Sequence, residues 1–497
     1  MSNYFHFLNT RRNKAGFSGL RVRIRLIIMI LAIAWSLIGM SPTSVLAAGT
    51  TYYVDNTNGS CSDAGAGTTP ALPFCTMGKG AATANAGDTV RVLAGTYAET
   101  VLPKTGTAGN PVTFLATPGV TVTGTPGAIN SGGAFRVTTK SYVVIDGFTV
   151  TGTADYGIYV WGSNHITISN NHISNSGSPA ATFTRAGIYI NSTTNSTISG
   201  NTSDHNTSHG ILLTNGSNNN MVSNNIAFAN AEQYQRNAEG IRLNASNNNT
   251  ILHNITYANE DSGLCFYTSS INNFVLGNAT YGNNDHGIDF NASPNNTVVG
   301  NTVQGNVTAG INFEGGSGGA TVANNIMVDN GLRLQVGGGT ASGQESNLRF
   351  EASSLTGNNL DYNIFHLNSG TVQVSWGLTD YTTLAAFQAA VPGQETHGLQ
   401  ADPLFTAPAP VAVRDPAVPP GVAINVGDYH LLGGSPAIDS ANADAPSEPI
   451  LDIEAMPVLM HLPRTPVQAY EPMMTEAHMN TNQTTIPRSL QRASQPT

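Results

Sequence analysis

Charged side chains are scarce in this sequence, and positively charged ones are the scarcer kind. Only 10% of the 497 residues are charged, with 20 Lys and Arg against 30 Asp and Glu. Six of the basic residues and none of the acidic ones fall within residues 1–48, so the rest of the chain has a formal charge of −16. Such a surface argues against nucleic acid as a partner. It would also repel an anionic polysaccharide, unless a metal ion or a local basic patch intervenes.

Cysteine is nearly absent, with three residues in the whole chain. Cys61 and Cys75 flank a loop of Gly, Pro and Thr, and in an exported protein they are expected to form a disulfide. Closing a loop of about 15 residues contributes on the order of 3 kcal/mol in the chain-entropy model. Cys265 lies in an apolar run of the repeat described below, where we interpret it as a free, packed thiol rather than a nucleophile.

Extended apolar runs are also few, and the clearest one lies near the start of the chain. A basic segment is followed by a 15-residue apolar run at 26–40 and then by Val45-Leu-Ala-Ala48, whose small residues suit signal peptidase. This order predicts a secretory signal peptide over residues 1–48. A retained membrane anchor is the alternative, although the run is short for the roughly 30 Å of a bilayer core. We therefore expect a secreted or cell-surface protein that has no membrane contact after cleavage.

A 3.6-residue apolar period is missing between residues 134 and 334, which argues against helices there. A phrase of Gly followed by apolar residues recurs instead, and its glycines are 30, 23, 30, 23, 24 and 23 residues apart. A second phrase keeps step with it and ends in Asn. The glycines are Gly157, Gly187, Gly210, Gly240, Gly263, Gly287 and Gly310, and the asparagines are Asn171, Asn201, Asn225, Asn254, Asn278, Asn301 and Asn325.

Short β-branched runs separated by Asn, Gly and Ser, at about 23 residues per period, predict stacked coils of short strands. In such a parallel β-helix, each coil lies about 4.8 Å above the last, with Ile over Ile inside and Asn over Asn at the corners. Stacked Asn side chains can exchange amide hydrogen bonds along their column. The asparagines therefore need no functional interpretation.

The Gly-Ile-x-apolar strands and the Asn columns resemble the right-handed parallel β-helix proteins of the pectate lyase superfamily, over roughly residues 50–405. The resemblance implies an all-β fold, a right-handed parallel β-helix forming a single solenoid with a short N-terminal capping helix. We expect that helix at 74–85, where the sequence has Ala-rich spacing. The resemblance is less specific for activity, because the superfamily includes lyases, hydrolases, epimerases and non-catalytic surface proteins.

Composition divides the chain into four parts. Residues 1–48 are the predicted signal peptide, and residues 49–405 are the predicted β-helix domain. Residues 406–471 combine a Pro-rich loop with a segment that resembles the closing module of many bacterial β-helices, although part of that module departs from its pattern. Residues 472–497 are expected to be a disordered tail. We expect a monomer.

The longer periods place two insertions at the same corner of the predicted solenoid, around 176–184 and 231–237. Long loops on a rigid scaffold often carry function, so a groove is expected between them. The outward positions of the neighbouring strand change from aromatic to charged along the column. Aromatic faces suit sugar rings, which predicts a polysaccharide partner. The predicted substrate-binding residues are Tyr159, Trp161, Tyr189 and Tyr267.

The charged positions suggest polysaccharide cleavage, most simply β-elimination on a uronate polymer. Ca²⁺ would bridge the substrate carboxylate to acidic side chains of the protein. Acidic side chains on neighbouring coils repel one another, and this repulsion favours a bound cation. Arg242 would neutralise substrate charge, and His209 or His286 would act as the base. The predicted metal ligands are Glu239, Asp261, Asp285 and Asp289.

The segment Asn259-Glu-Asp-Ser-Gly-Leu-Cys265 resembles the calcium-binding phrase of one pectate lyase family, which implies the same Ca²⁺ site. Ser262 and Cys265 stand where that family has acids, and Asn244 stands where it has its catalytic lysine. Three alternatives therefore stay open. The acids could flank a glycosidic bond at about 6.5 to 9.5 Å in an inverting glycoside hydrolase. The face could belong to a non-catalytic glycan-binding or structural protein, or the acids could be ordinary turn residues.

Overall fold

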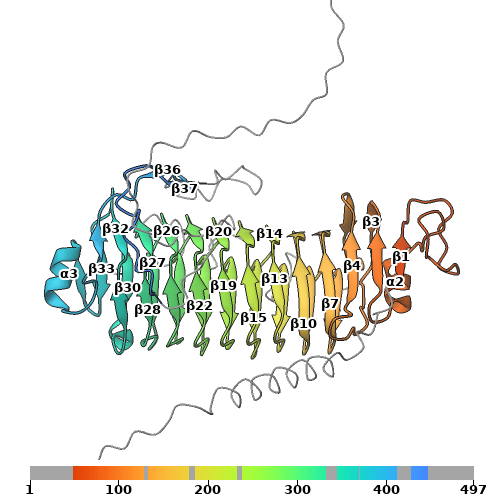
Figure 1. The fold of residues 1–497 in the computed structure, drawn as a ribbon, viewed down its shortest axis with the longest axis horizontal. Coiled ribbons are helices and arrows are strands. Elements are labelled where there is room, and N and C mark those ends of the chain that lie inside the picture. Colours follow the sequence, from red (N-terminus) through yellow and green to blue (C-terminus); the bar gives the residue numbers. More distant parts are fainter. Residues whose placement is uncertain are drawn as a thin grey trace, which may run out of the picture.

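A computed structural model describes residues 49–127, 133–177, 185–231, 238–331, 344–368, 370–410 and 427–445. These residues form an elongated solenoid of short strands with a helix at each end (Figure 1). The predicted signal peptide and the predicted tail lie outside the described residues. Within those residues, no helix is long and apolar enough to cross a membrane.

The solenoid is built from three parallel sheets, and each complete coil contributes one strand to each of them. Side chains alternate between core and surface because successive residues of a strand point to opposite faces. The first sheet contains β1 (Thr51–Val54), β2 (Thr89–Val92), β4 (Val112–Ala116), β7 (Ser141–Asp146), β10 (Asn164–Ser169), β13 (Thr197–Ser199), β16 (Met221–Ser223), β19 (Thr250–Leu252), β22 (Phe274–Leu276), β25 (Thr297–Val299), β28 (Thr321–Ala323) and β31 (Asn359–Asp361).

The other two sheets follow the first in each coil. The second sheet contains β3 (Gly95–Tyr97), β5 (Val120–Val122), β8 (Thr149–Thr151), β11 (His172–Ser174), β14 (Thr202–Asp204), β17 (Ile226–Phe228), β20 (Ile255–Tyr257), β23 (Ala279–Tyr281), β26 (Thr302–Gln304), β29 (Ile326–Val328), β32 (Ile364–His366) and β35 (Leu399–Gln400). The third sheet contains β6 (Phe135–Thr138), β9 (Ile158–Trp161), β12 (Ile188–Asn191), β15 (Ile211–Thr214), β18 (Ile241–Asn244), β21 (Leu264–Tyr267), β24 (Ile288–Asn291), β27 (Ala309–Glu314), β30 (Ser346–Phe350), β33 (Val374–Trp376) and the antiparallel β34 (Thr379–Tyr381).

The core of the solenoid consists of apolar residues stacked in register. The predicted buried column is confirmed, since its members pair one to one across successive strands and are at most 1% exposed. A second inward column ends in stacked phenylalanine rings, with centroids 4.3 to 4.7 Å apart. The first column is Ile188, Ile211, Ile241, Leu264, Ile288 and Ile311, and the stacked rings are Phe266, Phe290, Phe313 and Phe350.

The predicted asparagine column forms a hydrogen-bonded ladder. Each side-chain Nδ2 from Asn171 onward donates to Oδ1 of the next asparagine at 2.9 to 3.0 Å, as far as Asn363. Asn363 then donates to Oε1 of Glu395 at 2.6 Å, so a carboxyl group ends the ladder. A second ladder runs from Asn206 to Asn347 at the next corner. The ladders satisfy backbone and side-chain groups that the turns bury.

Both ends of the solenoid are covered. The predicted N-terminal helix is α2 (Met77–Thr83), which buries Met77, Gly80 and Ala81 against the first strands, and a disulfide joins Cys61 to Cys75 beside it. At the other end, α3 (Leu384–Ala390) buries Leu384 and Phe387. A single turn of 3-10 helix, η1 (Ala352–Ser354), precedes it in the chain. Covering the terminal coils removes open sheet edges.

The chain after the last coil folds back along the solenoid. Strands β36 (Phe405–Ala407) and β37 (Asp428–Leu431) pair antiparallel, and the Tyr429 ring lies 5.1 Å from that of Tyr281 on the second sheet. Asn324 and Asn442 exchange two hydrogen bonds, which hold this part of the predicted closing module against the first sheet. Residues 411–426 and 446–497 lie outside the described residues.

Candidate functional site

The outward face of the third sheet carries the residues that the sequence singled out. The residues two positions after the repeat glycines pair in register from strand to strand, which places them in one column on the surface side of the core. We call this the outer column. Extended by one coil at each end, it consists of Arg136, Tyr159, Tyr189, Leu212, Arg242, Cys265, Asp289, Asn312 and Arg349.

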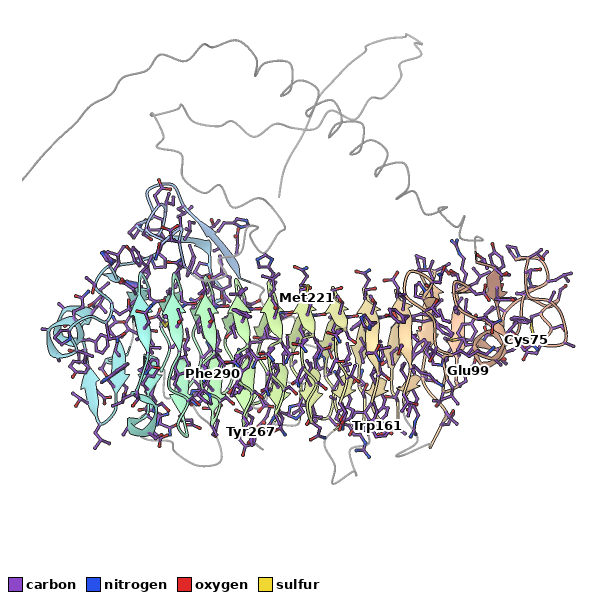
Figure 2. The ribbon with its side chains drawn as sticks, turned by 60° about the horizontal axis from the view of Figure 1, so that its bottom comes forward. Cys75, Glu99, Trp161, Met221, Tyr267 and Phe290 are labelled. Carbon is purple, nitrogen blue, oxygen red and sulfur yellow. A yellow bond between two sulfur atoms is a disulfide. The ribbon has the colours of Figure 1, made fainter. Side chains whose placement is uncertain are left out.

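The two predicted insertions fall mostly outside the described residues, since 178–184 and 232–237 are not described. The groove predicted between them therefore stays a prediction. The predicted substrate-binding Trp161 and Tyr267 are 42% and 38% exposed. Figure 2 shows them along one edge of the solenoid, with Met221 on the opposite side.

The aromatic end of the outer column is a stack of tyrosines. The Tyr159 and Tyr189 rings lie 5.4 Å apart and nearly parallel, and the Tyr156 ring lies 4.3 Å from that of Tyr189. Arg136 lies over the remaining face of Tyr159, with its guanidinium carbon 5.4 Å from the ring centre. Contacts within the protein therefore cover part of the faces of Tyr159 and Tyr189. That these rings stack on sugars stays a prediction, and the more exposed Trp161 fits the same role.

A buried ion-pair group occupies the middle of the face. His209 Nδ1 lies 2.6 Å from Oε2 of Glu239, and Arg242 Nη1 lies 2.8 Å from Oε1. The backbone N–H of Glu239 also donates to His209 Nδ1 at 3.2 Å. Burial raises the pKa of Glu239, but His209 through charge and hydrogen bonding, and Arg242 through charge, outweigh it and hold that pKa at about 2. Glu239 is therefore a fixed anion.

Three aspartates lie on the next two coils. Burial, followed by the charges of Glu239 and Asp285, raises the pKa of Asp261 well above its usual range. Burial raises the pKa of Asp289 to about 7; Glu314 and Asp285 add to the rise, while His286 and a hydrogen bond from Asn312 oppose it. Cys265 Sγ lies 3.7 Å from Asp289 Oδ2, consistent with a thiol whose burial raises its pKa. Asp289 is therefore partly protonated near neutral pH, and the environment of Asp261 also favours its protonated form.

The four acids predicted to bind Ca²⁺ do not form a ligand set. Among the described residues, no group of three or more His, Cys, Asp and Glu side chains is arranged to hold a metal ion. Both Glu239 oxygens already face side-chain nitrogens of the protein, His209 Nδ1 and Arg242 Nη1. The residues as arranged do not fit a calcium ion, so we assign no step to one.

The predicted bases are placed differently from expectation. His209 is 3% exposed and faces Glu239, and His286 is 3% exposed with its Nε2 3.7 Å from Oδ1 of Asp285. Buried imidazoles that face carboxylates are suited to orienting those carboxylates rather than to removing a proton from a bound polymer. Arg242 is half-buried, with its guanidinium carbon 4.5 Å from the centre of the Tyr267 ring.

Several residues of the face were missed from the sequence. Arg136 lies one coil before the first repeat glycine, and Ala134 stands at the glycine position there, so a search for glycine phrases passes over it. Arg349 Nη1 donates to Asn312 Oδ1 at 2.7 Å and lies 3.1 Å from Glu314 Oε2. Counting strand positions, rather than glycines, would have found both arginines.

Comparison with known proteins identifies the fold. The family model described as "Right handed beta helix region" matches residues 117–270 and 228–355, and no curated protein sequence matches the chain. Similar solved structures include a pectate lyase, at 17% identity over 83% of this chain and 98% of that chain with a TM-score of 0.47. A lacto-N-biosidase from Eubacterium ramulus is 12% identical over 71% of this chain and 67% of that one, with a TM-score of 0.49.

A third similar structure is the A-module of a mannuronan C-5 epimerase from Azotobacter vinelandii, 17% identical over 63% of this chain and 91% of that chain, with a TM-score of 0.44. These TM-scores lie below 0.5, so the identification depends on the family match and on the stacked parallel strands themselves. The fold predicted from the sequence is thereby confirmed, and the chain forms a right-handed parallel β-helix.

Proposed function

We propose that this protein is an enzyme that cleaves an acidic polysaccharide bound along the outer column, and that its own carboxyl groups supply the acid–base chemistry. The observation that carries the proposal is the opposite displacement of two carboxyl pKa values on one face of the solenoid, two coils apart. That of Glu239 is held at about 2, and that of Asp289 is raised to about 7. Environments that separate the pKa values of adjacent acids are typical of sites that need one proton donor and one anion.

Glycoside hydrolysis uses these groups most directly. Asp289, still partly protonated at neutral pH, would donate a proton to the leaving glycosidic oxygen. Asp285, which precedes β24 on the same coil as Asp289, would activate the attacking water as the general base. Asp261 lies on the preceding coil, where it can share with Asp289 the proton that is to be donated. Glu239 is the fixed anion that orients Arg242 and keeps the proton on Asp261.

The distribution of arginine supports an acidic substrate. Four of the five arginines that the structure describes lie at this face: three in the outer column and Arg185 against Tyr156. Three of the four pair with carboxylates, and Arg136 is the arginine of this face that no described Asp or Glu pairs with, so it is the positive charge that an anionic polymer would meet. The fifth, Arg91, lies on the first sheet.

One observation favours a second route, β-elimination on a uronate polymer. Arg242 stands between the tyrosines and the aspartates, where it can neutralise a uronate carboxylate and so acidify the adjacent ring proton. Elimination and hydrolysis yield different ends, because elimination leaves an ultraviolet-absorbing unsaturated sugar.

The compartment is part of the proposal. A polymeric substrate must be met outside the cell, and the predicted signal peptide at 1–48 would deliver the protein there. Export also permits the disulfide between Cys61 and Cys75.

The test is a panel of acidic and neutral polysaccharides incubated with the full-length protein, with reducing ends and ultraviolet absorbance measured together. We expect new reducing ends without absorbance from at least one acidic polymer, and no loss on chelation of divalent ions. Asp289→Asn should lower the rate by more than tenfold, about 1.4 kcal/mol of transition-state binding. Absorbing products lost on chelation would favour elimination with calcium, and binding without any product would favour a non-catalytic glycan-binding protein.

A further inference from the structure

The tyrosine end of the outer column carries hydrogen-bond donors that the proposed chemistry does not use. The Tyr189 hydroxyl accepts from Asn191 Nδ2 at 2.7 Å, which leaves its own proton free to donate to another group. Burial, followed by the charge of Tyr189, raises the pKa of Tyr159, and burial raises that of Tyr156 to about 12. The hydroxyls of Tyr156 and Tyr159 therefore remain protonated at neutral pH.

Arg136 adds a cation that no described carboxylate balances. It lies in the outer column beside Tyr159, with its guanidinium carbon 5.4 Å from the ring centre, and it is half-buried. No described Asp or Glu is within ion-pairing distance of it. Arg185, in contrast, is buried with its Nε 2.5 Å from Oδ1 of Asp155, and it packs 5.1 Å from the centre of the Tyr156 ring. The Asp155–Arg185 pair fixes the tyrosines, and Arg136 is left to meet an external anion.

We propose that Arg136 and the hydroxyls of Tyr159 and Tyr189 form a subsite that binds the anionic group of an acidic sugar residue. Guanidinium and phenol donors converging from adjacent strands match the acceptors of a carboxylate or sulfate. The exposed Trp161 lies two residues further along β9, about 7 Å away, where it presents an apolar surface to the same sugar ring.

The subsite rests on the proposed function, because one polymer must reach both it and the aspartates. Tyr189 is four strand steps from Asp289 along the outer column, roughly 19 Å at about 4.8 Å per step. The subsite therefore binds a sugar several residues from the cleaved bond, and it selects the substrate without taking part in the reaction.

The test is calorimetric titration of the full-length Asp289→Asn protein with oligogalacturonate, its carboxyl-reduced neutral form and a sulfated oligosaccharide. We expect at least one acidic ligand to bind at least tenfold more tightly than the neutral one. Arg136→Gln should remove that preference, Arg136→Lys should keep part of it, and Tyr159→Phe should weaken acidic binding while retaining the ring. Arg91→Gln, an exposed arginine on the first sheet, is the matched control and should change nothing.

Whether carboxylate or sulfate is the natural group follows from which acidic ligand loses most affinity in Arg136→Gln. Equal binding of acidic and neutral ligands, or an unchanged preference in a folded Arg136→Gln protein, would overturn the subsite. The two proposals fail separately. Arg136-dependent binding without cleavage of any polymer would reject the enzyme and leave the subsite, whereas cleavage with no acidic preference would reject the subsite alone.

Discussion

His209 and Glu239 lie 30 residues apart in sequence, yet their side chains meet on adjacent coils with Nδ1 2.6 Å from Oε2, both 3% exposed. Arg242 approaches the other carboxylate oxygen at 2.8 Å. A carboxylate enclosed in this way is held in one orientation by His209 and Arg242, and its charge raises the pKa of Asp261. The pair therefore links the stability of the third sheet to the protonation of the proposed site.

Glu239→Gln should destabilise the protein by about 3 to 5 kcal/mol, because the half-buried Arg242 would lose its buried anionic partner and His209 its carboxylate. Urea unfolding at pH 7 measures the loss. Asp428→Asn, which breaks an exposed Asp–His pair on β37, is the control and should have little effect. Equal, small losses in both variants would show that the buried triad is not a structural unit.

The same carboxylate predicts an acid dependence. Its folded pKa is depressed, so its contribution is fully present above the unfolded value of 4.5 and is lost as pH falls toward about 2. The difference in unfolding free energy between wild type and Glu239→Gln should therefore shrink as the pH is lowered from about 4.5 to about 2. A difference that stays constant over this range would contradict the assignment.

Glu395 should behave in the opposite way. It is buried at the end of the asparagine ladder, where burial raises its pKa to about 8 despite hydrogen bonds from Asn363. Since the folded pKa is raised, the native state holds a proton that the unfolded chain releases above 4.5. Its contribution to stability is present below pH 4.5 and is lost as pH rises through about 8.

Glu395→Gln removes that dependence, because a glutamine cannot ionise. We expect the variant to gain stability relative to wild type between pH 5 and pH 9, measured as the urea midpoint at each pH. If the wild-type curve is as flat as that of the variant, the carboxyl group is not buried as described.

Ile241→Asp should cost several kcal/mol, because it places a carboxylate without a partner in the buried column of the third sheet. Met221→Asp places the same side chain at an outward-facing position, since Met221 lies on β16 and is 43% exposed. We expect its unfolding free energy to change by no more than about 0.5 kcal/mol. Thermal melting of the two variants compares them directly. Similar melting temperatures would mean that the inward and outward assignments are reversed.

The fold could be predicted from the sequence because every coil repeats the same local choices. Ile241 and Ile288 are separated by two periods and still lie in one column, so alignment of the glycine phrases gave register as well as topology. The contacts that each side chain makes were harder to predict from the sequence. Glu239 aligns with the other acids in sequence, but its partner His209 comes from the preceding coil, and only the assembled geometry shows that this pair removes it from a calcium site.

The site was incompletely predicted for a related reason. Arg136 lies on a coil whose glycine is replaced by Ala134, so it was absent from the aligned phrases. The sequence also does not show that the Tyr159 and Tyr189 rings stack on each other, with centroids 5.4 Å apart. Such contacts depend on the spacing between coils and on rotamers, neither of which a repeat pattern contains.

The pH dependence of polymer cleavage tests the central claim most directly. The rate of reducing-end release from the acidic polysaccharide that is cleaved fastest should be measured from pH 4 to pH 10, for wild type and Asp289→Asn. If Asp289 is the proton donor, the wild-type rate should fall as pH rises through about 7, and the variant should be more than tenfold slower at pH 6. A wild-type rate that keeps rising up to pH 10, with absorbing products and with Asp289→Asn fully active, would contradict acid-assisted cleavage by this carboxyl group.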